Sequence, residues 1–215
     1  MAVNKLCEES VRNIMDVTGI ILADGKNPKM GGNKGTELIG GTPCIERVIQ
    51  RLTPITSRII LVTAGDTLTF STVKGIEVVT DNYRIKKPLT GIYTGLCCSR
   101  SKANIVVTCD MPFLNTALLD HMVKLSPAYD AIVPRWPNMQ KEPLHAVYSL
   151  SCLQTMKKHL ETNRLSIIHV LKEMHVLHLN KRGFAELDPQ FYSFLNINDQ
   201  ADIDLANKIA AEQKI

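Results

Sequence analysis

A glycine- and lysine-rich loop follows the first apolar run of the chain, and its residue types suit a phosphate-binding site. The stretch GIILADGKNPKMGGNKG spans residues 19–35. Gly25 and Gly31 let backbone N–H groups approach an anion, while Lys29 and Lys34 add flexible point charges. The spacing matches neither the G-x-x-x-x-G-K-S/T nor the G-x-G-x-x-G phosphate pattern. Composition alone therefore leaves a phosphate site and a plain surface loop as alternatives.

A carboxylate with the right placement for metal binding occurs in the middle of the chain. Asp110 follows the apolar run NIVVTC, where a buried strand ends and Pro112 turns the chain. A carboxylate at such a point can hold Mg²⁺, with phosphates and water completing the shell. The alternative is a cap for the next helix, but Asn115 or Thr116 can already serve as that cap. Position therefore favours Asp110 as a metal ligand.

The elements that would position these residues alternate along the chain. Short β-branched runs predict strands at residues 17–23, 57–63, 76–80, 104–109, 130–134, 145–150 and 176–179. Helical periods occur at residues 43–52, 115–125, 151–163, 166–174 and 198–213. Most of the strands are apolar at consecutive positions, which is typical of strands buried on both faces. The pattern predicts an α/β fold with a doubly wound, mainly parallel (Rossmann-like) sheet flanked by helices. Ligands of such sheets bind at the carboxyl ends of the strands, where the loop and Asp110 both lie.

Composition limits the remaining possibilities. The 215 residues suit a single domain over residues 17–215, with an extension of unknown purpose at residues 1–16. The net charge of +4 falls short of the basic stripe of a nucleic-acid-binding protein. No stretch reaches the roughly 18 apolar residues of a membrane span. Six scattered cysteines without a C-x-x-C pair fit a reducing, cytoplasmic setting.

Six segments, in order along nearly the whole chain, resemble one family of nucleotidyltransferases, that of the molybdenum cofactor guanylyltransferases. The family loop L-A-G-G-x-x-x-R-M-G-x-x-K is similar to residues 22–34, and V-x-x-C-D-M-P-F-L, the most specific block, is similar to residues 106–114. The other four segments are ELIGGTPCIERVIQRL (37–52), VVTDNYRIKKPLTGIYTGL (78–96), EPLHAVYS (142–149) and FLNINDQADID (194–204).

The resemblance implies a fold like that of nucleotide-diphospho-sugar transferases and a Mg²⁺-dependent transfer of GMP from GTP to molybdopterin, with release of pyrophosphate. It gives catalytic roles to Lys34, which would meet the triphosphate, and to Asp110, which would hold the metal. It places the remaining binding residues around the nucleotide and the pterin: guanine at Leu22 and Ala23, phosphates at Gly25, Lys29 and Gly31, base or ribose at Asp81, and pterin at Asn196 and Asn198. Asn198 has an equal alternative as a helix cap.

Three departures from the family pattern bear on activity. Asp24 stands where the family has glycine, and a carboxylate there should repel a triphosphate. Lys29 replaces an arginine and loses its bidentate geometry, and Lys87 replaces a glycine. One hypothesis is that Lys86 or Lys87 offsets the charge of Asp24.

These departures keep two alternatives open: a CTP-using or other nucleotidyltransferase, and a non-catalytic paralogue that binds a nucleotide or cofactor. The resemblance further implies a GTP-binding adaptor and molybdenum enzymes as partners, with no nucleic acid and no membrane.

Overall fold

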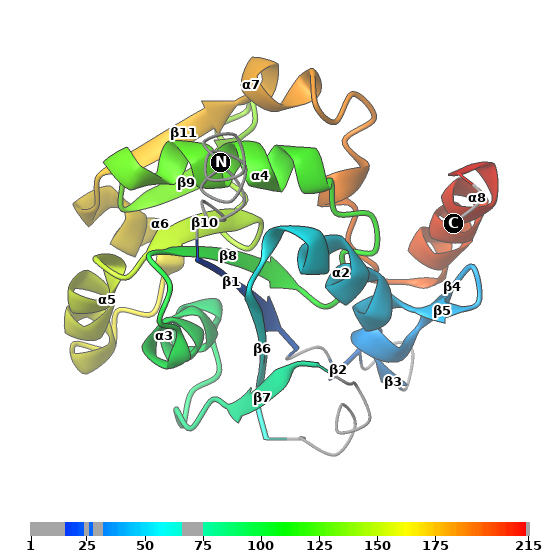
Figure 1. Cartoon of the computed structure of the whole chain (residues 1–215). Coiled ribbons are helices and arrows are strands. Elements are labelled where there is room, and N and C mark those ends of the chain that lie inside the picture. The colour runs from blue at the N-terminus through cyan, green and yellow to red at the C-terminus, as the bar shows by residue number, and fades with distance from the viewer. Residues whose placement is uncertain (1–15, 24–25, 28–31, 66–74, 214–215) are drawn as a thin grey trace, which may run out of the picture.

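A seven-stranded sheet forms the centre of the protein (Figure 1). The computed structural model describes residues 16–23, 26–27, 32–65 and 75–213. The strand order is β11-β9-β10-β8-β1-β6-β7. The strands are β1 (Val17–Leu22), β6 (Arg58–Thr63), β7 (Glu77–Thr80), β8 (Ala103–Thr108), β9 (Ala131–Arg135), β10 (Ala146–Ser149) and β11 (Val176–Asn180).

The sheet is mainly parallel, as the sequence predicts. Strand β1 runs parallel to both of its neighbours, β6 and β8, and every residue of β1 is buried. Only β10 runs against its neighbours, and it lies between β8 and β9. The consecutive apolar residues of the central strands are explained by helices that cover both faces of the sheet.

Two apolar clusters fill the two sides of the sheet. One joins alternate residues of β1 and β8 to α2 (Cys44–Leu52), α4 (Thr116–Leu125) and α7 (Lys181–Ala185). The other joins the remaining strand residues to α3 (Pro88–Cys98), α5 (Cys152–Glu161) and α6 (Ile167–Val170). Neighbouring residues of a strand thus belong to opposite clusters, as the pleat of a strand requires.

A third, smaller cluster attaches the last helix. Helix α8 (Gln200–Gln213) packs near the hairpin of β4 (Leu38–Ile39) and β5 (Thr42–Pro43), and the two lie side by side in Figure 1. A second hairpin consists of β2 (Lys26–Asn27) and β3 (Gly32–Asn33). The short 3₁₀ turns are η1 (Lys34–Thr36), η2 (Thr53–Ile55), η3 (Ser126–Ala128), η4 (Leu171–Glu173) and η5 (Tyr192–Phe194).

The structure corrects some predicted elements and adds others. The helix expected at residues 166–174 is only α6 followed by the 3₁₀ turn η4. Helices α3 and α7 were not expected. The predicted cap of α4 is confirmed, because the Asn115 side chain accepts a hydrogen bond from the N–H of Leu118. Of the predicted extension at residues 1–16, only Asp16 is described.

Helix α3 lies very close to the central strand. A Cβ atom at Gly95 would lie 2.4 Å from Cγ2 of Ile20, and one at Gly91 would lie 3.2 Å from Cδ2 of Leu22. Glycine at these two positions therefore lets the helix backbone approach β1 directly.

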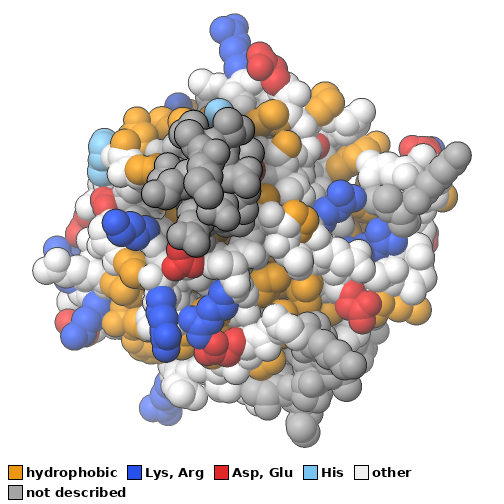
Figure 2. Space-filling view, viewed as in Figure 1, with side chains coloured by type: hydrophobic (Ala, Val, Ile, Leu, Met, Phe, Trp, Pro, Cys, Tyr) orange, Lys and Arg blue, Asp and Glu red, His pale blue; other side chains and the backbone are white. Residues whose placement is uncertain are grey.

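Basic and acidic side chains are interspersed on the face drawn in Figure 2. No helix within the described residues is long and apolar enough to cross a membrane.

Candidate active site

The strand order reverses beside β1, and the candidate site lies at that point. The chain leaves β1 for β6 and β7 on one side, then returns to β8 on the other. The carboxyl ends of β1 and β8 are joined by a hydrogen bond of 3.1 Å from the N–H of Cys109 to the carbonyl of Leu22. In open parallel sheets this reversal opens a crevice in which ligands bind.

Lys34 is fixed at this crevice by the turn that contains it. The Asn33 side chain accepts a hydrogen bond of 3.0 Å from the N–H of Gly35, which closes a local turn and begins η1. The Lys34 ammonium then donates to Oδ2 of Asp110 at 3.1 Å and to Oδ1 of Asn198 at 2.6 Å. The predicted convergence of Lys34 and Asp110 is confirmed.

Asp110 is buried, with 8% of its surface exposed, and has partners on both carboxylate oxygens. Thr108, two residues earlier, donates its hydroxyl to Oδ1, and Lys34 binds Oδ2. The carbonyl of Asp110 also accepts a hydrogen bond of 3.0 Å from the N–H of Ile197. This bond brings the segment that carries Asn196 and Asn198 against the end of β8.

Asn198 contributes to the site and does not cap α8. Its side chain accepts from Lys34 and donates to the carbonyl of Asn196 at 3.2 Å. The cap is Asp199, whose carboxylate accepts from the N–H of Asp202 at 3.1 Å. In return, Oδ2 of Asp202 accepts from the N–H groups of Asn198 and Asp199, as in a reciprocal capping box. The helix-cap alternative for the Asn198 side chain is therefore wrong.

Asp81 lies apart from this group. It follows β7, the edge strand, three strand spacings or roughly 14 Å from the end of β8. It is fully buried and accepts hydrogen bonds from the N–H of Tyr83 at 2.8 Å and from the hydroxyl of Thr90 at 2.6 Å. The Lys86 ammonium lies 3.8 Å from Oδ1 of Asp81. Asp81 thus organises the turn into α3.

The structure describes some of the remaining predicted site residues but not others. Leu22 and Ala23 are both buried, and the N–H of Ala23 donates to the carbonyl of Val62 at 2.9 Å. The Leu22 side chain contacts α3, so it belongs to the core. Lys87 is exposed at the start of α3. Four residues, Asp24, Gly25, Lys29 and Gly31, lie outside the described residues, as does any contact between Asp24 and Lys86.

A cavity of about 270 Å³ opens beside Asp110. Its lining combines the ends of β8 and of the last loop with the segment before β10, and consists of Thr108, Asp110, Met111, Glu142, Pro143, Leu144, Asn196 and Asn198. The sequence did not single out Thr108, whereas Glu142 is the first residue of the segment EPLHAVYS that resembles the family. Thr108 had one usable signal, since it stands two residues before Asp110 and so on the same side of an extended chain.

The oxygens around Lys34 suit a hard cation. Asp110 Oδ2 and Asn198 Oδ1 both accept hydrogen bonds from the Lys34 ammonium, so these two oxygens already interact with one positive charge. Mg²⁺ usually takes one or two carboxylates and keeps phosphate and water oxygens as its other ligands. No group of three or more His, Cys, Asp or Glu side chains gathers within the described residues. The donor set therefore fits Mg²⁺ held jointly with substrate phosphates.

The Cys44 thiol is not available as a nucleophile at neutral pH. Cys44 is buried, and burial, followed by the neighbouring Cys109 and Asp110, raises its pKa well above the ordinary value. The thiol therefore keeps its proton, and the thiolate is the form that acts as a nucleophile.

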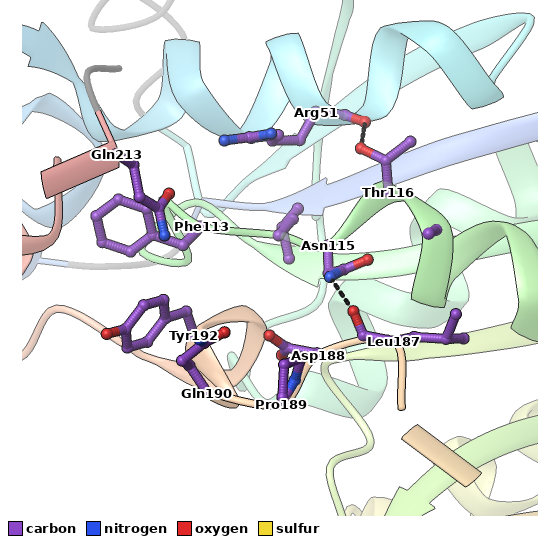
Figure 3. Close-up of a pocket in the computed structure, with 12 residues that line it drawn as sticks. Arg51, Phe113, Asn115, Thr116, Leu187, Asp188, Pro189, Gln190, Tyr192 and Gln213 are labelled. Carbon is purple, nitrogen blue, oxygen red and sulfur yellow. Dashed lines mark hydrogen bonds between the residues drawn. The ribbon is translucent and has the colours of Figure 1, made fainter. Parts of the chain in front are cut away.

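A second cavity, of about 350 Å³, lies between α2, the start of α4 and the loop before η5 (Figure 3). Arg51 lies on one side of it, and Asp188, Pro189 and Tyr192 lie on the other. Asn115 donates to the carbonyl of Leu187 at 2.8 Å and joins two of its walls. None of the predicted site residues lines this cavity.

The family follows from comparison with known proteins. The family model described as "MobA-like NTP transferase domain" matches residues 19–176. The chain belongs to this family. As a MobA-like NTP transferase it resembles a molybdenum cofactor guanylyltransferase of Desulfosudis oleivorans, with 31% identity over 88% of this chain and 94% of the relative. A relative from Pelotomaculum thermopropionicum, named as a probable molybdenum cofactor guanylyltransferase, is 29% identical over 94% of this chain and 97% of the relative.

Solved structures support the same fold for this MobA-like chain. Molybdopterin-guanine dinucleotide biosynthesis protein A from Archaeoglobus fulgidus superimposes with a TM-score of 0.80 at 23% identity, over 91% of this chain and 99% of that one. The 4-diphosphocytidyl-2C-methyl-D-erythritol synthase of Anaerococcus prevotii gives a TM-score of 0.69 at 14% identity, over 94% of this chain and 99% of that one. The predicted nucleotidyltransferase fold is confirmed.

Proposed function

We propose that this chain transfers the guanylyl group of GTP to the phosphate of molybdopterin and releases pyrophosphate. Relatives named as molybdenum cofactor guanylyltransferases match it over most of both chains. The observation that carries the proposal is the meeting of Lys34, Asp110 and Asn198 at the strand-order reversal. A positioned cation beside a buried carboxylate is what nucleotidyl transfer requires, because that reaction depends on charge neutralisation and alignment.

In the proposed reaction, a phosphate oxygen of the acceptor forms a bond to the α-phosphorus of GTP. The bond from that phosphorus to the bridging oxygen breaks, and its electron pair leaves with pyrophosphate. Lys34 neutralises charge on the triphosphate, while Asp110 and Asn198 fix the position of its ammonium. Asp110, oriented by Thr108, would hold Mg²⁺, which when bound supplies further charge neutralisation and aligns the phosphates.

The other site assignments are part of the same proposal. They place guanine at Leu22 and Ala23, the phosphates at Gly25, Lys29 and Gly31, the base or ribose side at Asp81, and the pterin side at Asn196 and Asn198. Asp81 would act through the turn it organises, since Tyr83 and Thr90 already engage its two oxygens. GTP binding, a cytoplasmic location, a GTP-binding adaptor and molybdenum enzymes as recipients belong to this proposal as well.

Pyrophosphate release tests the activity. We expect release from GTP only when molybdopterin is present, and none from CTP. Lys34→Met should lower kcat about a hundredfold or more, because it removes a preorganised charge from the transition state. Lys208→Met, which changes an exposed lysine of α8, is the matched control and should keep wild-type turnover.

Two results would reject the proposal. Turnover with CTP alone would assign the chain to cytidylyl transfer. Tight GTP binding without pyrophosphate release, in the presence of molybdopterin and Mg²⁺, would assign it a carrier or regulatory role instead.

A further inference from the structure

The Glu142 side chain lines both the cavity beside Asp110 and a second cavity that has no role in the reaction as described so far. Glu142 lines the cavity that contains Asp110 and also lines one of about 430 Å³. The other walls of the second cavity are Trp136, Pro137, Asn138, Gln140 and Phe194. A ligand that extends from Lys34 into the second cavity would therefore pass Glu142.

The position of Glu142 is set by its neighbours. Its Oε1 accepts hydrogen bonds from the indole N–H of Trp136 at 2.8 Å and from the side chain of Gln140 at 3.1 Å. The backbone closes a tight turn around it, since the N–H of Trp136 donates to the carbonyl of Gln140 at 2.8 Å, and the N–H of Glu142 donates to that of Pro134 at 3.0 Å. This carboxylate is held in place before any ligand arrives.

Trp136 is itself held rigidly. Its ring makes edge-on contacts with Phe184, Phe191 and Phe194, with centroids 5.1, 5.3 and 5.3 Å apart. Such aromatic pairs have a preferred geometry that resists rotation of the ring. Because the Trp136 ring is held by its neighbours, its hydrogen bond fixes the orientation of the Glu142 carboxylate.

The charge of Glu142 is left for a ligand to neutralise. Among the described residues no lysine, arginine or histidine forms an ion pair with it, and no group donates to its Oε2. A half-buried carboxylate with only neutral donors on one oxygen gains most from a ligand that offers adjacent N–H groups. Aromatic side chains in the same cavity favour a planar ring.

Strand β8 lies between Glu142 and the part of the sheet where the nucleotide is expected to bind. Glu142 comes from the connection between β9 and β10, on one side of β8, whereas the glycine-rich loop follows β1 on the other. Asp110, at the end of β8, stands between them. A guanine base and a pterin ring offer the same amino-pyrimidinone edge, and this arrangement assigns Glu142 to the acceptor.

We propose that Glu142, oriented by Trp136 and Gln140, binds the 2-amino and ring N–H edge of the acceptor's pterin, so that the acceptor's phosphate points towards the triphosphate that Lys34 neutralises. This inference rests on the proposed function for the identity of the acceptor. Trp136 and Gln140 are positioning residues, and Glu142 determines specificity.

The chain's single tryptophan gives a direct binding assay. Trp136 fluorescence would be titrated with 6-hydroxymethylpterin phosphate and with the corresponding lumazine phosphate, in which an oxygen replaces the 2-amino group. We expect the wild type to prefer the pterin by about ten- to a hundredfold, the value of one or two hydrogen bonds to a charged group. Glu142→Gln, which still accepts from Trp136, should reduce this preference to less than threefold and leave GTP affinity unchanged.

The control and the contrary outcomes are distinct. Glu212→Gln, an exposed change in α8, should keep the wild-type preference. The inference is overturned if the wild type does not discriminate, if Glu142→Gln keeps the preference, or if the variant loses discrimination between GTP and inosine triphosphate instead. These titrations contain no turnover step, so a failed pyrophosphate assay would reject guanylyl transfer without deciding the role of Glu142.

Discussion

Mild acid should destabilise this protein through one buried histidine. His145 lies beside the cavity lining and is completely buried, with Nε2 2.6 Å from the hydroxyl of Ser193 and its ring 4.5 Å from that of Phe194. Burial lowers the pKa of His145 from 6.5 to about 4. The folded protein therefore keeps this imidazole neutral across a pH range in which the unfolded chain would protonate it.

The size of the effect follows from that difference. Above pH 6.5 neither state binds the proton, and the full stability is present. As the pH falls from 6.5 towards 4, only the unfolded state gains the proton, so the free energy of unfolding falls. At about 1.4 kcal/mol for each pH unit, the loss from His145 is about 2 kcal/mol at pH 5 and about 3 kcal/mol in total.

Urea unfolding at pH 7.5 and at pH 5.0 measures this loss. We expect the wild type to lose about 2 kcal/mol more between the two conditions than His145→Gln does, because the variant has no imidazole to protonate. Each protein is compared with itself, so any constant cost of the substitution cancels. Burial also raises the pKa of Asp188, which acts in the opposite direction, but Asp188 is present in both proteins. Equal losses in the two proteins would refute the reasoning.

Three further substitutions test the packing and the site. Gly95→Ala should lower the free energy of unfolding by about 1–2 kcal/mol, because a Cβ 2.4 Å from Ile20 overpacks the core by more than the gain in helix propensity, and a melting temperature at or above wild type would contradict this. Asp202→Ala should cost about 1 kcal/mol in urea unfolding by removing the reciprocal cap of α8, and an unchanged midpoint would show the cap to be dispensable. Thr108→Val should reduce guanylyl turnover about tenfold through loss of its hydrogen bond to Asp110, and wild-type turnover would show that the carboxylate is oriented without it.

The sequence predicted most of the sheet but missed a helix that tertiary contacts stabilise. The strands of the sheet are apolar at consecutive positions, so their pattern is clear without a structure. Helix α3 contains Pro88, Gly91 and Gly95, which as isolated residues indicate turns. Its glycines are explained by the approach to Ile20 and Leu22, which only the fold reveals.

The candidate site also contains residues that the sequence could predict and contacts that it could not. Lys34 and Asp110 could be predicted because each follows a recognisable strand and both lie at the carboxyl edge of the sheet. The contact between Lys34 and Asn198 joins residues 164 positions apart, and no local pattern specifies it. The orientation of Glu142 depends on an aromatic cluster whose members come from three separate segments, so spacing alone gave no signal for it.

The bonds that Lys34 makes to Asp110 and Asn198 have a consequence for synthesis of the protein. The ribosome makes Lys34 before Asp110 and Asp110 before Asn198, so both oxygens that bind the ammonium are present only after residue 198 has been made. A nascent chain that has not yet reached residue 198 contains the sequences of β1 and β8 but has an incomplete centre, because it lacks the Asn198 oxygen. Proteolytic cleavage just before Asn198 would break the covalent connection between Lys34 and Asn198 and leave the centre similarly incomplete once the released segment dissociates.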